Sequence, residues 1–134
     1  MNEDDDDFDI HSLDFDDELS KLMNEDVKDR EWKRRYLNIL QQLKNNESSA
    51  VFWDPVPLDE VVDYTKYVQR PMDLGKITKN VLMDFYSSDH RLFAKEVRLV
   101  WSNCLAYNQK GTPLHNLGLE LKAFFESLYE IYFM

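Results

Sequence analysis

The sequence predicts an all-α protein, a bundle of four helices with one long loop. Three observations point to this class. Four segments place apolar residues at the three- and four-residue spacing of an amphipathic helix. No segment alternates apolar and polar residues as a half-buried strand does. The 134 residues include only 3 glycines and 4 prolines, too few for the many tight turns of a β-sandwich or barrel. The length suits one domain, so we expect a single helix bundle.

The first 26 residues are set apart by their charge. They hold 12 of the 26 acidic residues and one of the 16 basic ones, whereas the rest of the chain is almost neutral. A run of like charge resists compaction, so we interpret residues 1–26 as a flexible, solvated tail and residues 27–134 as the domain. The alternative is a short docked helix, because four apolar residues share one helical face. They are Phe15, Leu19, Leu22 and Met23.

The first helix of the domain is predicted over residues 27–46, followed by a long loop. Five apolar residues make the stripe of this helix: Trp32, Tyr36, Ile39, Leu40 and Leu43. Residues 50–71 show no helical periodicity, and Pro55 and Pro57 exclude a continuous helix there. Loops of this length in compact domains tend to be functional or disordered. Because this one is rich in apolar residues, we expect it to pack and to line a pocket.

Three further helices complete the bundle. The second is predicted from Leu74 to Phe85, with Asp73 as its N-cap. The third runs from residue 88 or 89 to Tyr107. A turn containing Gly111 follows, and the last helix runs from about residue 113 to the C-terminus, with a proline in its first turn.

Several classes of function are disfavoured by what the chain contains. One cysteine, Cys104, permits no internal disulfide and no thiolate metal cluster, which fits a reducing, intracellular setting. His11, His90 and His115 are too scattered for a metal site. Cys104 and His115 could serve as nucleophile and base only with an orienting group that the sequence does not offer. We therefore expect no enzyme, no metal and no cofactor.

The distribution of charge and apolar residues disfavours two further classes. The almost neutral domain lacks the basic excess of a general nucleic-acid binder, so no direct DNA binding is expected. The apolar runs are much shorter than a membrane span. The acidic N-terminus is unlike a signal peptide, so we expect neither a membrane protein nor a secreted one.

Three stretches together resemble the bromodomain family. They are FWDPV (residues 52–56) with Tyr64 eight residues later, YVQRPMDLGKI (residues 67–77) and EVRLVWSNCLAYNQKGTPLH (residues 96–115). The similarity extends over about residues 27–134, with the motifs in order and at matching spacing. It implies a left-handed bundle of helices Z, A, B and C. The ZA and BC loops of such a bundle meet at one end and enclose a pocket for acetylated lysine.

The resemblance assigns polar roles to Asn108 and Tyr64. Acetylation leaves lysine with an uncharged amide, which needs an apolar channel and a neutral hydrogen-bond donor. An asparagine amide is such a donor, and Asn108 would donate to the acetyl oxygen. Tyr64 would reach the same oxygen through an ordered water. Without the neighbouring motifs, Asn108 would more often be a helix cap, and Tyr64 would more often serve in packing alone.

Six further residues match the family's pocket: Phe52, Val56, Val61, Cys104, Tyr107 and Leu114. The resemblance makes Phe52 the floor beside the acetyl methyl, and Val56 and Val61 the wall. Leu114 falls at the gatekeeper position. Tyr107 would orient the loops. Cys104, one turn before the asparagine, would fill space as a small apolar residue.

One departure concerns the outer shelf of the pocket. The family often has Trp-Pro-Phe where this chain has Ala50, Val51 and Phe52, and the nearby Trp53 is expected to point elsewhere. The implied function is a nuclear reader of acetylated lysine peptides, most naturally histone tails, within chromatin-associated complexes. The alternative is a helical protein–protein interaction module with a degenerate pocket. Retention of both Asn108 and Tyr64 favours the reader.

Overall fold

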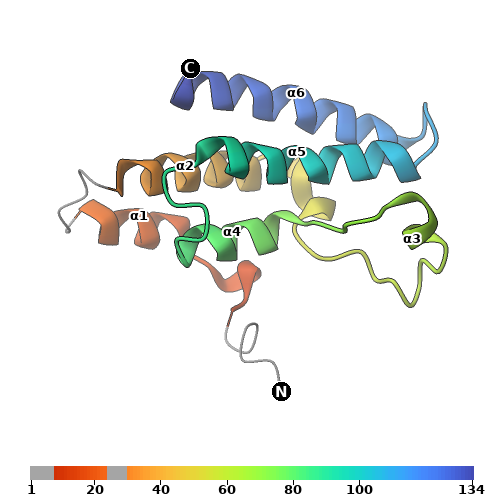
Figure 1. Cartoon of the computed structure of the whole chain (residues 1–134), viewed down its shortest axis with the longest axis horizontal. Coiled ribbons are helices and arrows are strands. Elements are labelled where there is room, and N and C mark those ends of the chain that lie inside the picture. Colours follow the sequence, from red (N-terminus) through yellow and green to blue (C-terminus); the bar gives the residue numbers. More distant parts are fainter. Residues whose placement is uncertain (1–7, 24–29) are drawn as a thin grey trace.

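The computed structural model describes residues 8–23 and 30–134, and every regular element within them is helical. In chain order they are η1 (Ile10–Ser12), α1 (Phe15–Met23), α2 (Glu31–Asn45), η3 (Glu47–Phe52), α3 (Tyr64–Tyr67), α4 (Leu74–Leu82), α5 (His90–Tyr107) and α6 (Pro113–Phe133). The helices α2, α4, α5 and α6 are the four predicted ones, so the all-α bundle is confirmed. The long loop (residues 46–73) and the α5–α6 loop (residues 108–112) lie at the same end (Figure 1).

Side-chain caps fix where the bundle helices begin. The Asp73 carboxylate accepts from the Lys76 backbone N–H at 2.8 Å, which confirms the predicted N-cap of α4. The Asp89 carboxylate and the Thr112 hydroxyl do the same for α5 and α6. α4 ends at Leu82, earlier than expected, and the following turn contains Asp84 at a φ of 60°. α2 begins at Glu31, and the earlier part of its predicted range includes residues outside the described ones.

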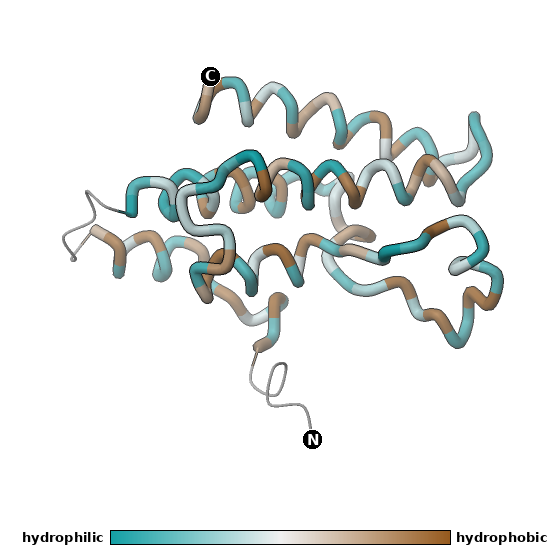
Figure 2. The backbone as a smooth tube through the Cα atoms, viewed as in Figure 1, coloured by the Kyte–Doolittle hydropathy of each residue, from teal (hydrophilic) through white to brown (hydrophobic). Residues whose placement is uncertain are grey.

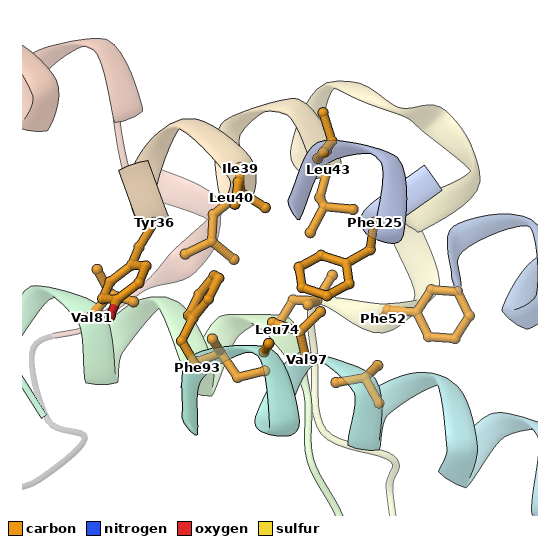
Figure 3. Packing of buried hydrophobic residues seen from close by; sticks show 14 of the residues in the cluster. Tyr36, Ile39, Leu40, Leu43, Phe52, Leu74, Val81, Phe93, Val97 and Phe125 are labelled. Carbon is orange, nitrogen blue, oxygen red and sulfur yellow. The ribbon is translucent and has the colours of Figure 1, made fainter. Parts of the chain in front are cut away.

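The core is formed by the apolar faces of these helices. α5 packs on α6, and α2 packs on both α4 and α6. Apolar and polar residues are interspersed along each helix (Figure 2). At the centre, the Tyr36 ring stacks on Phe93 with 4.4 Å between centroids, and Phe125 lies beside them (Figure 3). The Tyr36 hydroxyl donates to the Ser87 carbonyl at 2.9 Å, so its polar atom is buried with a partner.

Residues 8–23 pack against the bundle, which corrects the expectation of a solvated tail for this part of the chain. Ile10, Phe15 and Leu22 are buried in the main core cluster, although Met23 is 74% exposed. α1 packs on α2 (Figure 1). We call residues 8–23 the N-terminal strap. Residues 1–7 and 24–29, including the predicted domain boundary, lie outside the described residues.

The physical reason for this difference lies in how the charges of α1 are arranged. Its acidic residues Asp16, Asp17 and Glu18 lie in the first turn, where the positive end of the helix dipole favours them. Lys21 pairs with two of them, at 3.4 Å to Asp17 and 3.2 Å to Glu18. The charge therefore sits on one side of the helix while the other side is buried, and burial of the apolar side outweighs the repulsion.

Candidate functional site

The first part of the long loop is held by a chain of buried hydrogen bonds. Where α2 ends, the Asn46 side chain accepts from the Ser48 backbone N–H at 3.0 Å and starts η3. The Ser49 hydroxyl donates to the Leu43 carbonyl at 2.6 Å and accepts from the Trp53 indole N–H at 2.8 Å. Trp53 is 1% exposed and, as predicted, does not line the cavity described below. It anchors the loop on the bundle instead.

The second part of the long loop is tied to α5 at two points. The Tyr107 hydroxyl donates to the Asp63 carboxylate at 2.7 Å. The Asn103 side-chain amide donates to the Arg70 carbonyl at 2.9 Å. Between these ties lies the single turn of α3, which begins with the buried Tyr64. The loop therefore returns to the end of α5 and places Tyr64 beside it.

The α5–α6 loop completes the enclosure. α5 ends at Tyr107, and the Asn108 backbone N–H donates to the Cys104 carbonyl at 3.0 Å. Gly111 takes a φ of 89°, a left-handed conformation that glycine adopts without steric cost. Pro113 then stands in the first turn of α6, as expected.

These segments enclose a cavity of about 170 Å³ between the long loop and the end of α5. All eight predicted pocket residues line it: Phe52, Val56, Val61, Tyr64, Cys104, Tyr107, Asn108 and Leu114. Four more line it that were not predicted as pocket residues: Val51, Asp54, Met72 and Val100. Val51 and Leu114, 55% and 44% exposed, mark the mouth, whereas Phe52, Met72 and Val100 are buried. The cavity is thus an apolar channel that opens between the two loops.

Two of the four additional residues could have been found from the sequence. Val100 lies one helical turn before Cys104, so the spacing that places Cys104 beside Asn108 also brings Val100 to the same face of α5. Asp54 lies inside the FWDPV stretch, between two pocket residues. Met72 gave no such signal, because its position depends on the path by which the loop returns to α4.

The side-chain amide of Asn108 makes two contacts with Cys104. Its Nδ2 donates to the Cys104 carbonyl at 3.0 Å, which is a capping contact at the end of α5. The same nitrogen lies 3.6 Å from the Cys104 sulfur, a weak acceptor. The residue is half-buried and lines the cavity. The capping bond therefore fixes the amide, and its second hydrogen, held only by sulfur, can donate to a stronger acceptor in the cavity.

Tyr64 provides a second polar group in the wall. It is 5% exposed, and its ring lies 5.0 Å from that of Tyr107. Burial, with a smaller contribution from Cys104, raises the pKa of its phenol above the ordinary value. The hydroxyl therefore remains protonated at neutral pH. Within the described part of the chain, it has no hydrogen-bond partner, which leaves it able to bind a ligand or water.

Tyr107 and Cys104 have their polar atoms occupied. The bond from Tyr107 to Asp63 is the main cause of the raised pKa of that phenol. The Cys104 thiol donates to the Leu114 carbonyl at 3.1 Å, and burial raises its pKa. A thiol held in its neutral form by burial is a poor nucleophile. Its bond goes to a backbone carbonyl and not to His115, so the geometry does not assemble a catalytic pair.

Three other features would point to a different function: a metal site, a membrane-spanning helix or a second ligand site in the described residues. Among residues 8–23 and 30–134, no cluster of three or more histidine, cysteine or acidic side chains could hold a metal ion. No helix in the same ranges has the length and apolar character to cross a membrane. A larger groove of about 680 Å³ lies along α5 and α6, but long charged side chains such as Lys95, Arg98 and Lys122 wall it. The smaller apolar cavity better fits a ligand site.

Comparison with known proteins identifies the fold. The family model described as "Bromodomain" matches residues 36–120, more than half of the chain. The chain belongs to the bromodomain family. Its long loop is therefore the ZA loop of that family and its α5–α6 loop the BC loop. Bromodomains are, in general, non-enzymatic acetyl-lysine readers of chromatin proteins and transcription factors.

Named relatives and solved structures agree with this assignment. The bromodomain is 38% identical over 92 residues to the SWR1 complex bromodomain subunit bdf1 of Schizosaccharomyces pombe, covering 67% of this chain and 16% of that protein. It is 37% identical over 84 residues to a bromodomain-containing protein homolog of Drosophila melanogaster, covering 63% of this chain and 6% of that protein. The chain thus spans a small fraction of these relatives.

Two solved bromodomains have the same fold. That of Trypanosoma cruzi BDF2 superposes with a TM-score of 0.67 at 28% identity, covering 73% of this chain and 86% of the other. That of human BAZ1A superposes with a TM-score of 0.69 at 23% identity, covering 81% and 94%. Because the identity to the BAZ1A bromodomain is only 23%, that similarity supports the fold alone.

Proposed function

We propose that this bromodomain binds acetylated lysine in the cavity between its two loops, with Asn108 as the main polar contact. The observation that carries the proposal is the amide of Asn108 at the end of an apolar channel, with one hydrogen capping α5 and the other facing only the weak acceptor Cys104 Sγ. The channel accepts the aliphatic stem and the methyl group, and the amide donates to the acetyl oxygen. A free ammonium group would lose most of its hydration in this largely apolar channel and would meet the N–H donor of Asn108, so binding depends on acetylation.

The residues that line the pocket offer the ligand one further polar contact and several apolar ones. Tyr64 supplies a protonated hydroxyl that reaches the acetyl oxygen through a bridging water. Phe52 forms the floor, and its ring meets Trp101 edge-on at 5.2 Å, which fixes its plane. Val56 and Val61 line the side on the long loop, and Leu114 stands opposite at the mouth.

The partner we propose is a basic peptide such as an acetylated histone tail. The long loop carries Asp54, Asp59, Glu60 and Asp63 within ten residues and no basic residue among them. Asp54 lines the cavity, and Asp59 and Glu60 are exposed. An acidic rim attracts lysine and arginine residues that flank an acetylated lysine. We therefore place the protein in the nucleus, in chromatin-associated complexes, with contacts to histone tails and not directly to DNA.

The affinity for one acetylated lysine should be modest. Ala50 and Val51 are exposed where the family often has a large aromatic shelf. An aromatic side chain contributes about 150–250 Å² of burial, which is missing here. We expect dissociation constants of roughly tens to hundreds of micromolar, or about -5 to -6.5 kcal/mol. Such a module works best beside other binding modules of the same assembly.

Replacement of Asn108 by Ala tests the proposal. The variant leaves the acetyl carbonyl buried and unpaired, at a cost of about 1–3 kcal/mol, so a singly acetylated basic peptide should bind roughly 5- to 150-fold more weakly. Calorimetry with wild type and variant measures this. Tyr64→Phe should cost less, because only a bridged contact is lost. The unmodified peptide serves as the ligand control.

The alternative, an interaction module with a degenerate pocket, predicts no binding of acetylated lysine. An acetyl-lysine analogue in excess would then leave the melting temperature of the wild type unchanged, although a ligand that binds only the folded state must raise it. If wild type and Asn108→Ala bind the acetylated peptide with equal affinity, Asn108 does not contact the ligand.

A further inference from the structure

Three consecutive residues of the long loop point in different directions beside the cavity. Phe52 lines the cavity, whereas Trp53 turns into the bundle and is 1% exposed. Asp54 returns to the edge of the cavity. Because these residues share one short stretch of backbone, the position of Trp53 sets the positions of both neighbours. Whatever holds Trp53 and Asp54 therefore also places the floor of the pocket.

The N-terminal strap holds both of them. The Phe15 ring meets the Trp53 ring edge-on, with 6.3 Å between centroids and an interplanar angle of 74°. The His11 ring nitrogen Nε2 lies 2.8 Å and 3.0 Å from the two carboxylate oxygens of Asp54. The strap and the start of the long loop are 43 residues apart in sequence at this contact.

The N terminus of α4 also packs against the place where the strap meets the long loop. A Cβ at Gly75 would lie 2.5 Å from the Trp53 carbonyl oxygen and 3.4 Å from Cγ2 of Ile10. The backbone of the loop and the strap therefore both lie against this glycine. Ile10 is 7% exposed, so the strap shields this contact from solvent.

The strap is itself fixed on either side of His11. The Asp9 carboxylate accepts from the His11 backbone N–H at 3.0 Å and from the Ser12 hydroxyl at 2.8 Å, which shapes η1. Beyond His11, the Asp16 carboxylate accepts from the Gln41 side chain of α2 at 2.7 Å. His11 is thus held at a set position relative to the bundle. The strap lies before the family match, which begins at residue 36.

We propose that the strap is a positioning element of the binding site. Through Trp53 and Asp54, the positioning residues Phe15 and His11 hold the floor of the pocket at its working distance from Asn108. A loop held in its bound conformation loses less conformational entropy when ligand enters, so the strap raises affinity without touching the ligand. This inference rests on the proposed function of the pocket.

Substitutions in the full chain test it with matched controls. His11→Ala removes the tie to the long loop, and Glu126→Ala removes a partly exposed tie between α6 and Arg98 of α5, which involves neither the strap nor the loops. The probe is a neutral, capped acetyl-lysine, so that a change in rim charge does not affect its binding. NMR titration gives the affinity, and thermal melting gives the stability of each variant.

We expect His11→Ala to weaken binding of this probe by about 2- to 5-fold, the size typical of a partly exposed hydrogen bond to a carboxylate. Glu126→Ala should leave the affinity within about 1.5-fold of wild type at a similar melting temperature. His11→Gln, which keeps an N–H donor, should recover part of the loss. Phe15→Leu, which keeps an apolar side chain but loses the ring contact with Trp53, should weaken binding as His11→Ala does.

The outcomes separate the strap from the pocket. If wild type binds the probe but His11→Ala and Phe15→Leu bind it equally well, the positioning role is wrong and the pocket proposal stands. The positioning role is also wrong if Glu126→Ala weakens binding as much as His11→Ala. If wild type itself does not bind, the proposed function fails first.

Discussion

The two halves of the long loop contrast in how they are held. In residues 46–56, Ser49, Phe52 and Trp53 are buried. In residues 57–70, Tyr64 and Val68 are buried, but Leu58 is 46% exposed and Val62 is 80% exposed. Both halves are rich in apolar residues, so composition does not decide burial here. The difference is that the first half has a buried chain of hydrogen bonds and a strap behind it.

The two halves of the loop form different walls of the pocket, and these walls are held in different ways. The floor residue Phe52 belongs to the first half, whereas Val61 and Tyr64 belong to the second. The second half is tied to α5 by Tyr107 to Asp63 and by Asn103 to Arg70. We infer that the first half fixes the depth of the site and that the second half adjusts to the peptide.

The largest effect should come from removing the anchor of the first half. Trp53→Ala leaves a cavity in the core and should reduce the free energy of unfolding by about 3–5 kcal/mol. Val62→Ala in the second half should change it by less than about 0.5 kcal/mol. Chemical denaturation of both variants measures the difference. A small loss for Trp53→Ala would contradict the anchoring of the first half.

Gly75→Ala should disturb the first half less severely. Its new methyl group would lie 2.5 Å from the backbone oxygen of Trp53. Because this oxygen belongs to the backbone, it can move only if the loop around Trp53 also moves. Overpacking of this kind costs about 1–3 kcal/mol of stability, seen as a lower melting temperature. Gly118→Ala is the control, since its methyl group would meet the Cys104 sulfur at 2.9 Å, a side-chain atom that can shift. A greater loss for Gly118→Ala would contradict this explanation.

Tyr107→Phe should loosen the second half alone. It removes the hydrogen bond to Asp63, worth about 0.5–1.5 kcal/mol, and should weaken peptide binding by about 2- to 12-fold. Tyr132→Phe is a matched control, because it removes a surface bond between α6 and Gln42 of α2 that involves neither loop. Calorimetry with the acetylated peptide compares the two. Equal affinities would mean that the second half holds its position without this tie.

The smallest effect concerns alkaline pH. Burial raises the pKa of Tyr64 above 10.0 and that of Cys104 above 9.0 in the folded state. The unfolded chain therefore loses these protons first, so the stability they contribute is complete below about pH 9 and is lost as the pH rises further. Thermal melting between neutral and alkaline pH should show this decline. Peptide affinity should stay constant near pH 7, where both groups remain protonated.

The sequence predicted the bundle well because its helices carry local signals. The capping residue Asp73 and the apolar stripe of α2 fix their elements through neighbours a few residues away. The expected solvated tail was wrong for the described strap, because the partner of Phe15 is Trp53, far along the chain. The short helices η3 and α3 were not predicted either, since their turns form where the loop packs.

The pocket was predictable for a different reason. The resemblance supplied residues that local spacing alone could not bring together, and all eight line one cavity. Their roles in binding remain our proposal. Met72 was missed because its place depends on tertiary packing, whereas Val100 followed from helical periodicity.

The contact of the strap with Gly75 also has a consequence for the order of folding during synthesis. Residues 8–23 are made before Trp53 and Gly75, and at about 5–20 residues per second that interval lasts seconds. Until then α1 lacks Trp53, the ring partner of Phe15. We infer that its acidic residues, Asp16, Asp17 and Glu18, serve during this time as gatekeepers that keep the nascent segment from aggregating. The charge that made this segment look like a tail thus protects it until its docking site exists.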